Sequence, residues 1–168
     1  MKKVNSKGFT LIELLIVIAI IAVIAGAVFV ALNPLQRFQD TRDARRWSDV
    51  SNVLNAIKVN QVDNKGSYVF PVSSDSLVVA GNSYMISDAT TSAGCSPAAC
   101  GSLVSSDASC VNLHNLVASG YLGGLPVSPN GSGNWSETIT GYVLTKTTAG
   151  SIKIQACEGE NGDISVVR

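Results

Sequence analysis

The chain has 168 residues, of which 12 are Lys or Arg and 12 are Asp or Glu, so its formal net charge is zero. Only 14% of the residues are charged, a low fraction that suits a protein packed against copies of itself. The sequence has a single histidine, no glycine-rich phosphate loop and no Gly-x-Ser-x-Gly sequence. Because catalysis needs a nucleophile with a base, or paired carboxylates in a cleft, we predict no enzyme activity and no cofactor.

The N-terminal segment combines a basic leader, one carboxylate and a long apolar run. Nineteen residues from Leu14 to Leu32 carry no polar side chain, which is long enough for a helix that spans a bilayer. Glu13 precedes this run and costs about 3 kcal/mol if it enters the hydrocarbon, whereas the thirteen large apolar residues return about −0.4 kcal/mol each. Insertion is therefore favoured, and a charge kept against this penalty indicates a functional site.

The stretch Lys7-Gly8-Phe9-Thr10-Leu11-Ile12-Glu13-Leu14 resembles the processing site of type IV prepilins and type II secretion pseudopilins. The resemblance implies that a prepilin peptidase cleaves after Gly8 and methylates the new amine of Phe9, so that residues 1–8 are a cleaved leader. It also implies an assembly role for Glu13, whose carboxylate attracts the N-terminal amine of a neighbouring subunit during filament growth.

Elementary electrostatics agrees with this role for Glu13. Two opposite charges in a low-dielectric layer attract strongly, and each relieves the burial penalty of the other. The alternative is a carboxylate that lies near the lipid headgroups and is simply solvated. A conventional secretory signal is excluded, because the apolar run is too long and the cleavage site precedes it.

The orientation of the chain follows from the motif and the cysteines rather than from charge. Lysines and arginines flank the apolar run on both sides, so they give no asymmetry. The processing motif requires a cytoplasmic N-terminus, and all four cysteines lie after residue 90, which indicates an oxidising compartment outside. Loss of the leader removes three lysines and leaves a mildly acidic chain, which argues against nucleic acid as the main partner.

The helix is predicted to continue beyond the membrane. We assign residues 9–32 to a transmembrane and assembly helix and residues 33–62 to its amphipathic continuation. Pro34 cannot donate a hydrogen bond to the carbonyl of Val30, which predicts a kink between the two parts. The second part has an apolar stripe at helical spacing, formed by Trp47, Val50, Val53, Leu54, Ile57 and Gln61.

The polar face of this second part carries alternating charges. Asp43 with Arg46, and Arg45 with Asp49, stand at helical ion-pair spacings. A basic cluster on a helix also fits a phosphate-binding surface, but interleaved aspartates favour a salt-bridge face that is solvated or lies between subunits.

The four cysteines, Cys95, Cys100, Cys110 and Cys157, allow three disulfide pairings. We favour a short Cys95–Cys100 loop, with Cys110 tied to Cys157 near the last strands. Zinc is the rival ligand, but the sequence has no close Cys-x-x-Cys pair.

Residues 63–168 are predicted to form an extracytoplasmic globular head. Its first part, residues 71–109, is rich in Ser, Ala, Gly and Thr, and contains one or two marginal strands at 77–79 and 84–86. A short helix is expected at residues 113–116. The last third alternates apolar and polar residues around turns, which predicts a strand meander. In that meander Ile152 and Ile154 face the helix, and Cys157 lies on the opposite face of the sheet.

A second resemblance lies between residues 120 and 129. Gly120-Tyr121-Leu122 and Leu125-Pro126-Val127-Ser128-Pro129 resemble a passage of major pseudopilins that often leads into a calcium-binding loop. Ser128 stands where that pattern has aspartate, which puts calcium in doubt. Glu158, Glu160 and Asp163 are hard oxygen ligands elsewhere in the chain, but acidic turns are usually only solvated, and we predict no metal.

These observations predict an α+β fold in which a long kinked N-terminal helix packs against a C-terminal antiparallel sheet, as in pilins. The predicted function is a structural subunit of a type IV pilus-like filament. Its expected partners are copies of itself in a helical filament, the prepilin peptidase, an inner-membrane assembly platform and, before assembly, membrane lipid. It is expected as a single-pass membrane protein that later joins a cell-surface filament. Two alternatives stay open: a periplasmic pseudopilin of a type II secretion system, and a minor pilin that binds a surface or DNA.

Overall fold

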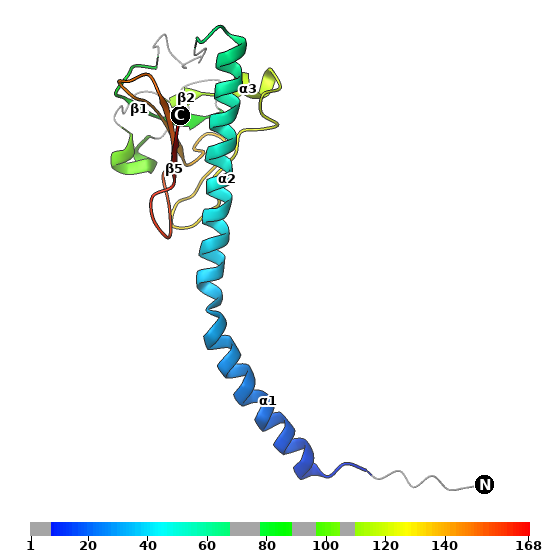
Figure 1. Cartoon of the computed structure of the whole chain (residues 1–168). Helices are drawn as coiled ribbons and strands as arrows, with labels where there is room; N and C mark the ends of the chain where they lie inside the picture. Colours follow the sequence, from blue (N-terminus) through cyan, green and yellow to red (C-terminus); the bar gives the residue numbers. More distant parts are fainter. Residues whose placement is uncertain (1–7, 68–77, 89–96, 105–109) are drawn as a thin grey trace, which may run out of the picture. The chain divides into compact units, whose positions relative to one another are not determined.

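A computed structural model describes residues 8–67, 78–88, 97–104 and 110–168 of the chain, and Figure 1 traces its elements. The chain divides into two compact units, an N-terminal unit (Met1–Phe38) and a C-terminal unit (Gln39–Arg168), and each is described by itself. Residues 1–7 of the predicted leader (1–8) and Cys95 lie outside the described residues.

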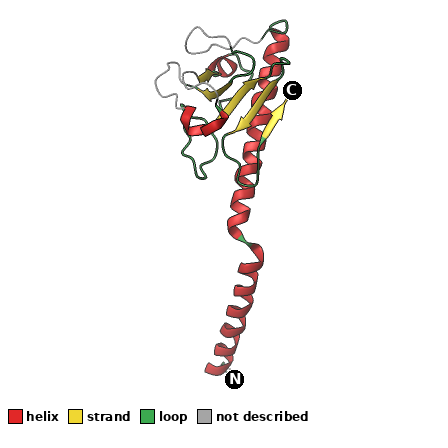
Figure 2. Ribbon diagram, turned by 90° about the vertical axis from the view of Figure 1, so that its left-hand side faces the viewer, coloured by secondary structure: helices red, strands yellow, loops and turns green. Residues whose placement is uncertain are grey.

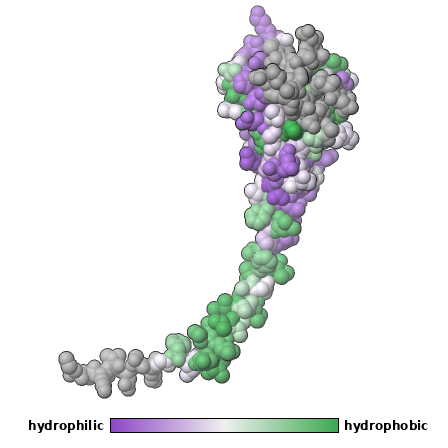
Figure 3. All heavy atoms as spheres, turned by 180° about the vertical axis from the view of Figure 1, so that it is seen from behind, coloured by the Kyte–Doolittle hydropathy of each residue, from purple (hydrophilic) through white to green (hydrophobic). Residues whose placement is uncertain are grey.

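The N-terminal unit is built on helix α1 (Leu11–Leu32). None of its 22 residues is buried, and Figure 3 shows the continuous hydrophobic surface that results. The chain contains a helix that is long and apolar enough to cross a membrane, by length and composition. An isolated apolar helix of this length has no favourable place in water, so α1 requires lipid or other helices around it.

A one-residue break separates α1 from helix α2 (Pro34–Asp63), visible as a short loop between the two red helices in Figure 2. Asn33 ends α1 in the left-handed conformation (φ 37°, ψ 70°), which asparagine tolerates better than most residues. Pro34 then begins α2, at the first helical position, where its missing N–H would have no partner inside the helix. The helical hydrogen bonds are therefore interrupted at Asn33, one residue before the proline.

The C-terminal unit contains a five-stranded sheet in the order β2-β1-β3-β4-β5. The strands are β1 (Ser83–Ser87), β2 (Cys110–Asn112), β3 (Tyr142–Lys146), β4 (Ile152–Ala156) and β5 (Ser165–Val167). A 3₁₀ segment η1 (Pro97–Leu103) and a short helix α3 (His114–Ala118) complete the described elements. The α+β class and the C-terminal meander β3-β4-β5 are confirmed, as is the short helix near residue 114.

The prediction of an all-antiparallel sheet is wrong at one edge, because β1 and β2 pair in parallel. A parallel pair needs a long crossover, and the 22 residues from 88 to 109 that join the two strands are long enough for it. The strand predicted as marginal at 84–86 is in fact β1, which lies inside the sheet between β2 and β3 and is almost fully buried. Val78 and Val79, from the other predicted patch, are not in a strand.

The two faces of the sheet bury different sets of side chains. On one face, α2 packs against residues from β1, β3 and β4 in a core that includes Val50, Val53, Leu54, Ile57, Tyr84, Ile86, Leu144, Ile152 and Ile154. The opposite face holds a smaller cluster of Met85, Val143, Cys100 and Cys110, with Trp135 and Cys157 packed at its edge. Cys157 thus lies across the sheet from Ile152 and Ile154, as the alternation predicts.

The buried stripe of α2 begins differently from the prediction. Trp47 is 45% exposed, whereas Arg46 is 0% exposed and Asp43 is buried beside it. The stripe therefore runs from Asp43 through Arg46 to Val50, and its first turns meet polar loops of the C-terminal unit instead of the apolar sheet.

Candidate functional site

The residues of the predicted processing site lie at the start of the described chain. Gly8, Phe9 and Thr10 are exposed and precede the first helical residue, so the Gly8–Phe9 bond is in non-helical backbone. The Phe9 side chain is 86% exposed. A Cβ on Gly8 would meet nothing within 4 Å, so packing inside this chain gives no reason for a glycine there.

Thr10 and Glu13 form a capping box at the start of α1. The hydroxyl Oγ1 of Thr10 accepts a hydrogen bond from the Glu13 backbone N–H at 3.3 Å. In return, Glu13 Oε2 accepts from the Thr10 backbone N–H at 2.9 Å and from the Thr10 hydroxyl at 2.8 Å. The box satisfies two backbone donors that a helix start leaves unpaired, and it holds the carboxylate over the first turn.

This geometry has a chemical consequence for Glu13. Both donors from Thr10 reach the same carboxylate oxygen, Oε2. The capping box therefore leaves Oε1 for a further donor from outside the chain, and a cationic donor there would neutralise the carboxylate.

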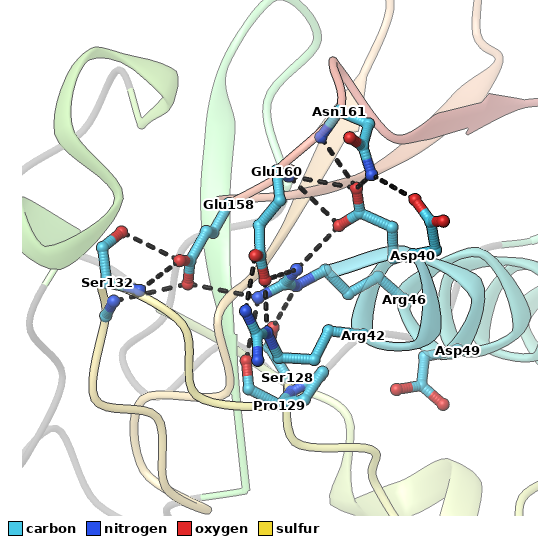
Figure 4. Close-up of polar contacts among 12 residues, drawn as sticks. Asp40, Arg42, Arg46, Asp49, Ser128, Pro129, Ser132, Glu158, Glu160 and Asn161 are labelled. Atoms are coloured by element: carbon cyan, nitrogen blue, oxygen red, sulfur yellow. Dashed lines mark hydrogen bonds and ion pairs between the residues drawn. The ribbon is translucent and has the colours of Figure 1, made fainter. Parts of the chain in front are cut away.

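The second site is a buried ionic cluster in the C-terminal unit, drawn in Figure 4. We call it the Arg46 cluster and define it as Arg42, Asp43, Arg46, Ser128, Pro129, Glu158 and Glu160.

At its centre, the Arg46 guanidinium contacts three carboxylates. Nη1 lies 2.7 Å from Asp43 Oδ1 and 3.2 Å from Glu160 Oε1, and Nη2 lies 3.3 Å from Glu158 Oε2. Two neutral oxygens complete the contacts of this side chain. Arg46 Nε donates to Ser128 Oγ at 3.1 Å, and Nη2 donates to the Pro129 carbonyl at 2.9 Å.

The three carboxylates have further donors that hold them in place. The backbone N–H groups of Glu160 and Asn161 donate to Asp43. Burial raises the pKa of Asp43, but these two donors and the Arg46 guanidinium outweigh it, and the pKa lies below its usual value.

Glu158 and Glu160 are held ionised in the same manner. Burial raises the pKa of Glu158, but backbone and hydroxyl donors of Ser132 and the indole N–H of Trp135 lower it below the usual value. The pKa of Glu160 is lowered chiefly by its hydrogen bond to Arg42. All three acids are therefore charged at neutral pH, and the cluster is ionic.

Part of the predicted charge pattern on α2 is confirmed and part is wrong. The pairs Asp43–Arg46 and Arg45–Asp49 both exist, the second at 3.9 Å with Arg45 65% exposed. However, Arg46 is not on a solvated face, because loops more than 80 residues away in the chain close over it. The missed partners, Glu158 and Glu160, have no sequence signal that connects them to α2.

One disulfide joins Cys100 to Cys157, with 5.0 Å between their Cα atoms. The predicted Cys95–Cys100 and Cys110–Cys157 pairing is therefore wrong. Cys100 and Cys157 both lie on the sheet face opposite α2, so the fold brings them together although 57 residues separate them. Cys110 is disulfide-bonded as well, and none of the described cysteines is free.

Comparison with known proteins identifies the N-terminal site. Residues 3–29 match the family model described as the prokaryotic N-terminal methylation motif. The chain thus carries the processing signal of type IV pilin and pseudopilin precursors. No curated protein and no solved structure matches the chain.

Proposed function

We propose that the chain is a structural subunit of a type IV pilus-like filament. The observation that carries the proposal is the coincidence, within one segment, of the methylation motif, a non-helical Gly8–Phe9 bond and an apolar helix with no buried residue. Such a helix needs partners, and equivalent helices of other copies supply them once the subunit leaves the lipid.

In this proposal the prepilin peptidase cuts after Gly8 on the cytoplasmic side and methylates the amine of Phe9. The cationic amine of one subunit then approaches Glu13 of its neighbour at the assembly platform. Oε2 of Glu13 already accepts the Thr10 donors, so the amine binds Oε1 without disturbing the start of α1. The attraction is strong because the helix ends are drawn into a low-dielectric layer.

The C-terminal unit contributes rigidity rather than chemistry. A disulfide braces one face of its sheet, and the Arg46 cluster ties two loops to α2 on the other side. The chain is expected to lie outside the cytoplasm after α1, where disulfides persist.

The test is the N-terminus of the protein in sheared surface filaments. Mass spectrometry should find an abundant peptide that begins at N-methylated Phe9 in the filament fraction. If this peptide is found only in the membrane fraction, the protein is a pseudopilin or a low-copy subunit instead. An intact Met1 terminus in every fraction would refute processing altogether.

Two glycine variants sharpen this test. Gly8→Ile should block cleavage. A Cβ at position 8 would meet nothing within 4 Å, so we attribute the need for glycine there to recognition by the peptidase. Gly26→Ala, at an equally open position on α1, should be processed like the natural chain.

A further inference from the structure

The Arg46 guanidinium lies in a shell of oxygen atoms that resembles the surroundings of a bound cation. Its three nitrogens contact three carboxylates, one hydroxyl and one backbone carbonyl, and the side chain is 0% exposed. Carboxylate, hydroxyl and carbonyl oxygens are also the ligands that hard divalent cations prefer. The occupant of this shell in the present structure is the chain's own side chain.

The charge balance shows why a cation is required at this position. Three carboxylates, from Asp43, Glu158 and Glu160, converge on a buried point, and such a group is stable only if positive charge faces it. Arg46 supplies one charge at the centre, and Arg42 supplies a second at the outer side of Glu160. The remaining negative charge is stabilised by uncharged hydrogen-bond donors: the Asn161 backbone N–H donates to Asp43, and the Trp135 indole N–H donates to Glu158.

The residues present do not fit a calcium ion. Ser128, where the resembling pseudopilin passage has aspartate, gives a hydroxyl that accepts from Arg46. Asp163 is exposed, and within the described parts of the chain no group of three or more His, Cys, Asp or Glu side chains is placed to hold a metal. The Arg46 guanidinium occupies the space between the three carboxylates of its cluster.

We propose that these oxygen atoms form a guanidinium-binding site that is occupied by the chain's own Arg46 side chain. Arg46 thus takes the structural role of a divalent cation, and the C-terminal unit folds without metal. The loop that carries Ser128 and Pro129 and the loop that carries Glu158 and Glu160 are then joined to α2 by a covalently attached cation. Unlike a metal, this cation cannot be removed by chelators or by dilution outside the cell.

The first experiment uses the natural full chain in detergent micelles. Its thermal unfolding midpoint should be the same in EDTA and in millimolar calcium. Trp135 reports on the cluster because its indole N–H donates to Glu158 Oε2 at 3.1 Å. A Trp47→Phe background leaves Trp135 as the only tryptophan, since the chain has two. In the natural chain or in this background, a midpoint that falls in EDTA and recovers in calcium would overturn the proposal.

The second experiment empties the site with Arg46→Ala. We expect the midpoint to fall by at least about 5 °C, and millimolar methylguanidinium to restore part of it where sodium chloride of equal ionic strength does not. Arg46→Lys should stay destabilised. The compact ammonium of lysine cannot reach all the carboxylates that the planar guanidinium of arginine contacts with its separate nitrogens. Recovery with calcium instead of methylguanidinium, or no recovery with either cation, would overturn the assignment of a guanidinium site.

Discussion

Glu13→Gln and Thr10→Val should separate the capping role of the N-terminal site from its charge. Glutamine fills the third position of a capping box as glutamate does, so Glu13→Gln keeps the helix start and removes only the negative charge. Thr10→Val does the reverse, because it removes the hydroxyl that accepts from the Glu13 N–H at 3.3 Å and leaves the carboxylate in place. Thr10→Ser retains the hydroxyl and is the matched control.

The two changes should differ in magnitude. Loss of a helix cap costs about 1 kcal/mol, and the long apolar α1 is strongly favoured as a helix in lipid in any case. Loss of a charge-assisted hydrogen bond between subunits costs about 1.5–3 kcal/mol. That energy corresponds to a factor of roughly 10 to 150 in the equilibrium constant for adding each subunit. Glu13→Gln should therefore abolish most filaments, whereas Thr10→Val should reduce them only a few-fold.

The assay compares the amount of subunit in sheared filaments with the amount held in the membrane, at equal total expression. Mass spectrometry of the Phe9 terminus checks that each variant is cleaved, and membrane fractionation checks that it is inserted. Normal filament levels for Glu13→Gln would refute the charge role. Equal losses for Glu13→Gln and Thr10→Val would contradict the prediction that the charge contributes more to assembly than the helix cap does.

Three further predictions concern the C-terminal unit. Arg46→Met should lower the free energy of unfolding by about 3–5 kcal/mol, because it removes the buried cation that three carboxylates contact. Arg45→Met on the exposed face should change it by less than about 1 kcal/mol. Urea unfolding of the two variants decides, and similar losses would contradict the burial argument. Acid should destabilise the C-terminal unit below about pH 4.5, because the pKa of Glu160 and its neighbours in the folded state lies below the unfolded value of about 4. The stability that these ionised carboxylates contribute is complete above the unfolded pKa and is lost as pH falls through the folded pKa. A thermal unfolding midpoint that does not change from pH 7 to pH 3 would refute this direction. Replacing Cys100 and Cys157 together by serine should lower the free energy of unfolding by up to about 4 kcal/mol, because the unfolded chain is no longer constrained by a disulfide between residues 57 positions apart. A reductant should then shift the thermal unfolding midpoint of this variant less than that of the natural chain.

Sequence patterns alone predicted the parts of the molecule that depend on neighbouring residues. The apolar run of α1 and the methylation motif are contiguous, so one segment contains all the information. The alternation of Ile152 and Ile154 against Cys157 likewise follows from the two-residue period of a strand, and it placed the cysteine on the correct face.

Only the tertiary structure decided which distant residues meet. The spacing of Asp43 and Arg46 indicated an ion pair, but whether that pair lies in solvent or in the interior depends on loops more than 80 residues later. The same holds for the Cys100–Cys157 bond and for the parallel pairing of β1 with β2, where local reasoning favoured short-range connections. Short loops lose less entropy when they close, so sequence arguments favour them. In the folded chain, packing of the sheet against α2 outweighs that preference and brings these separated residues together.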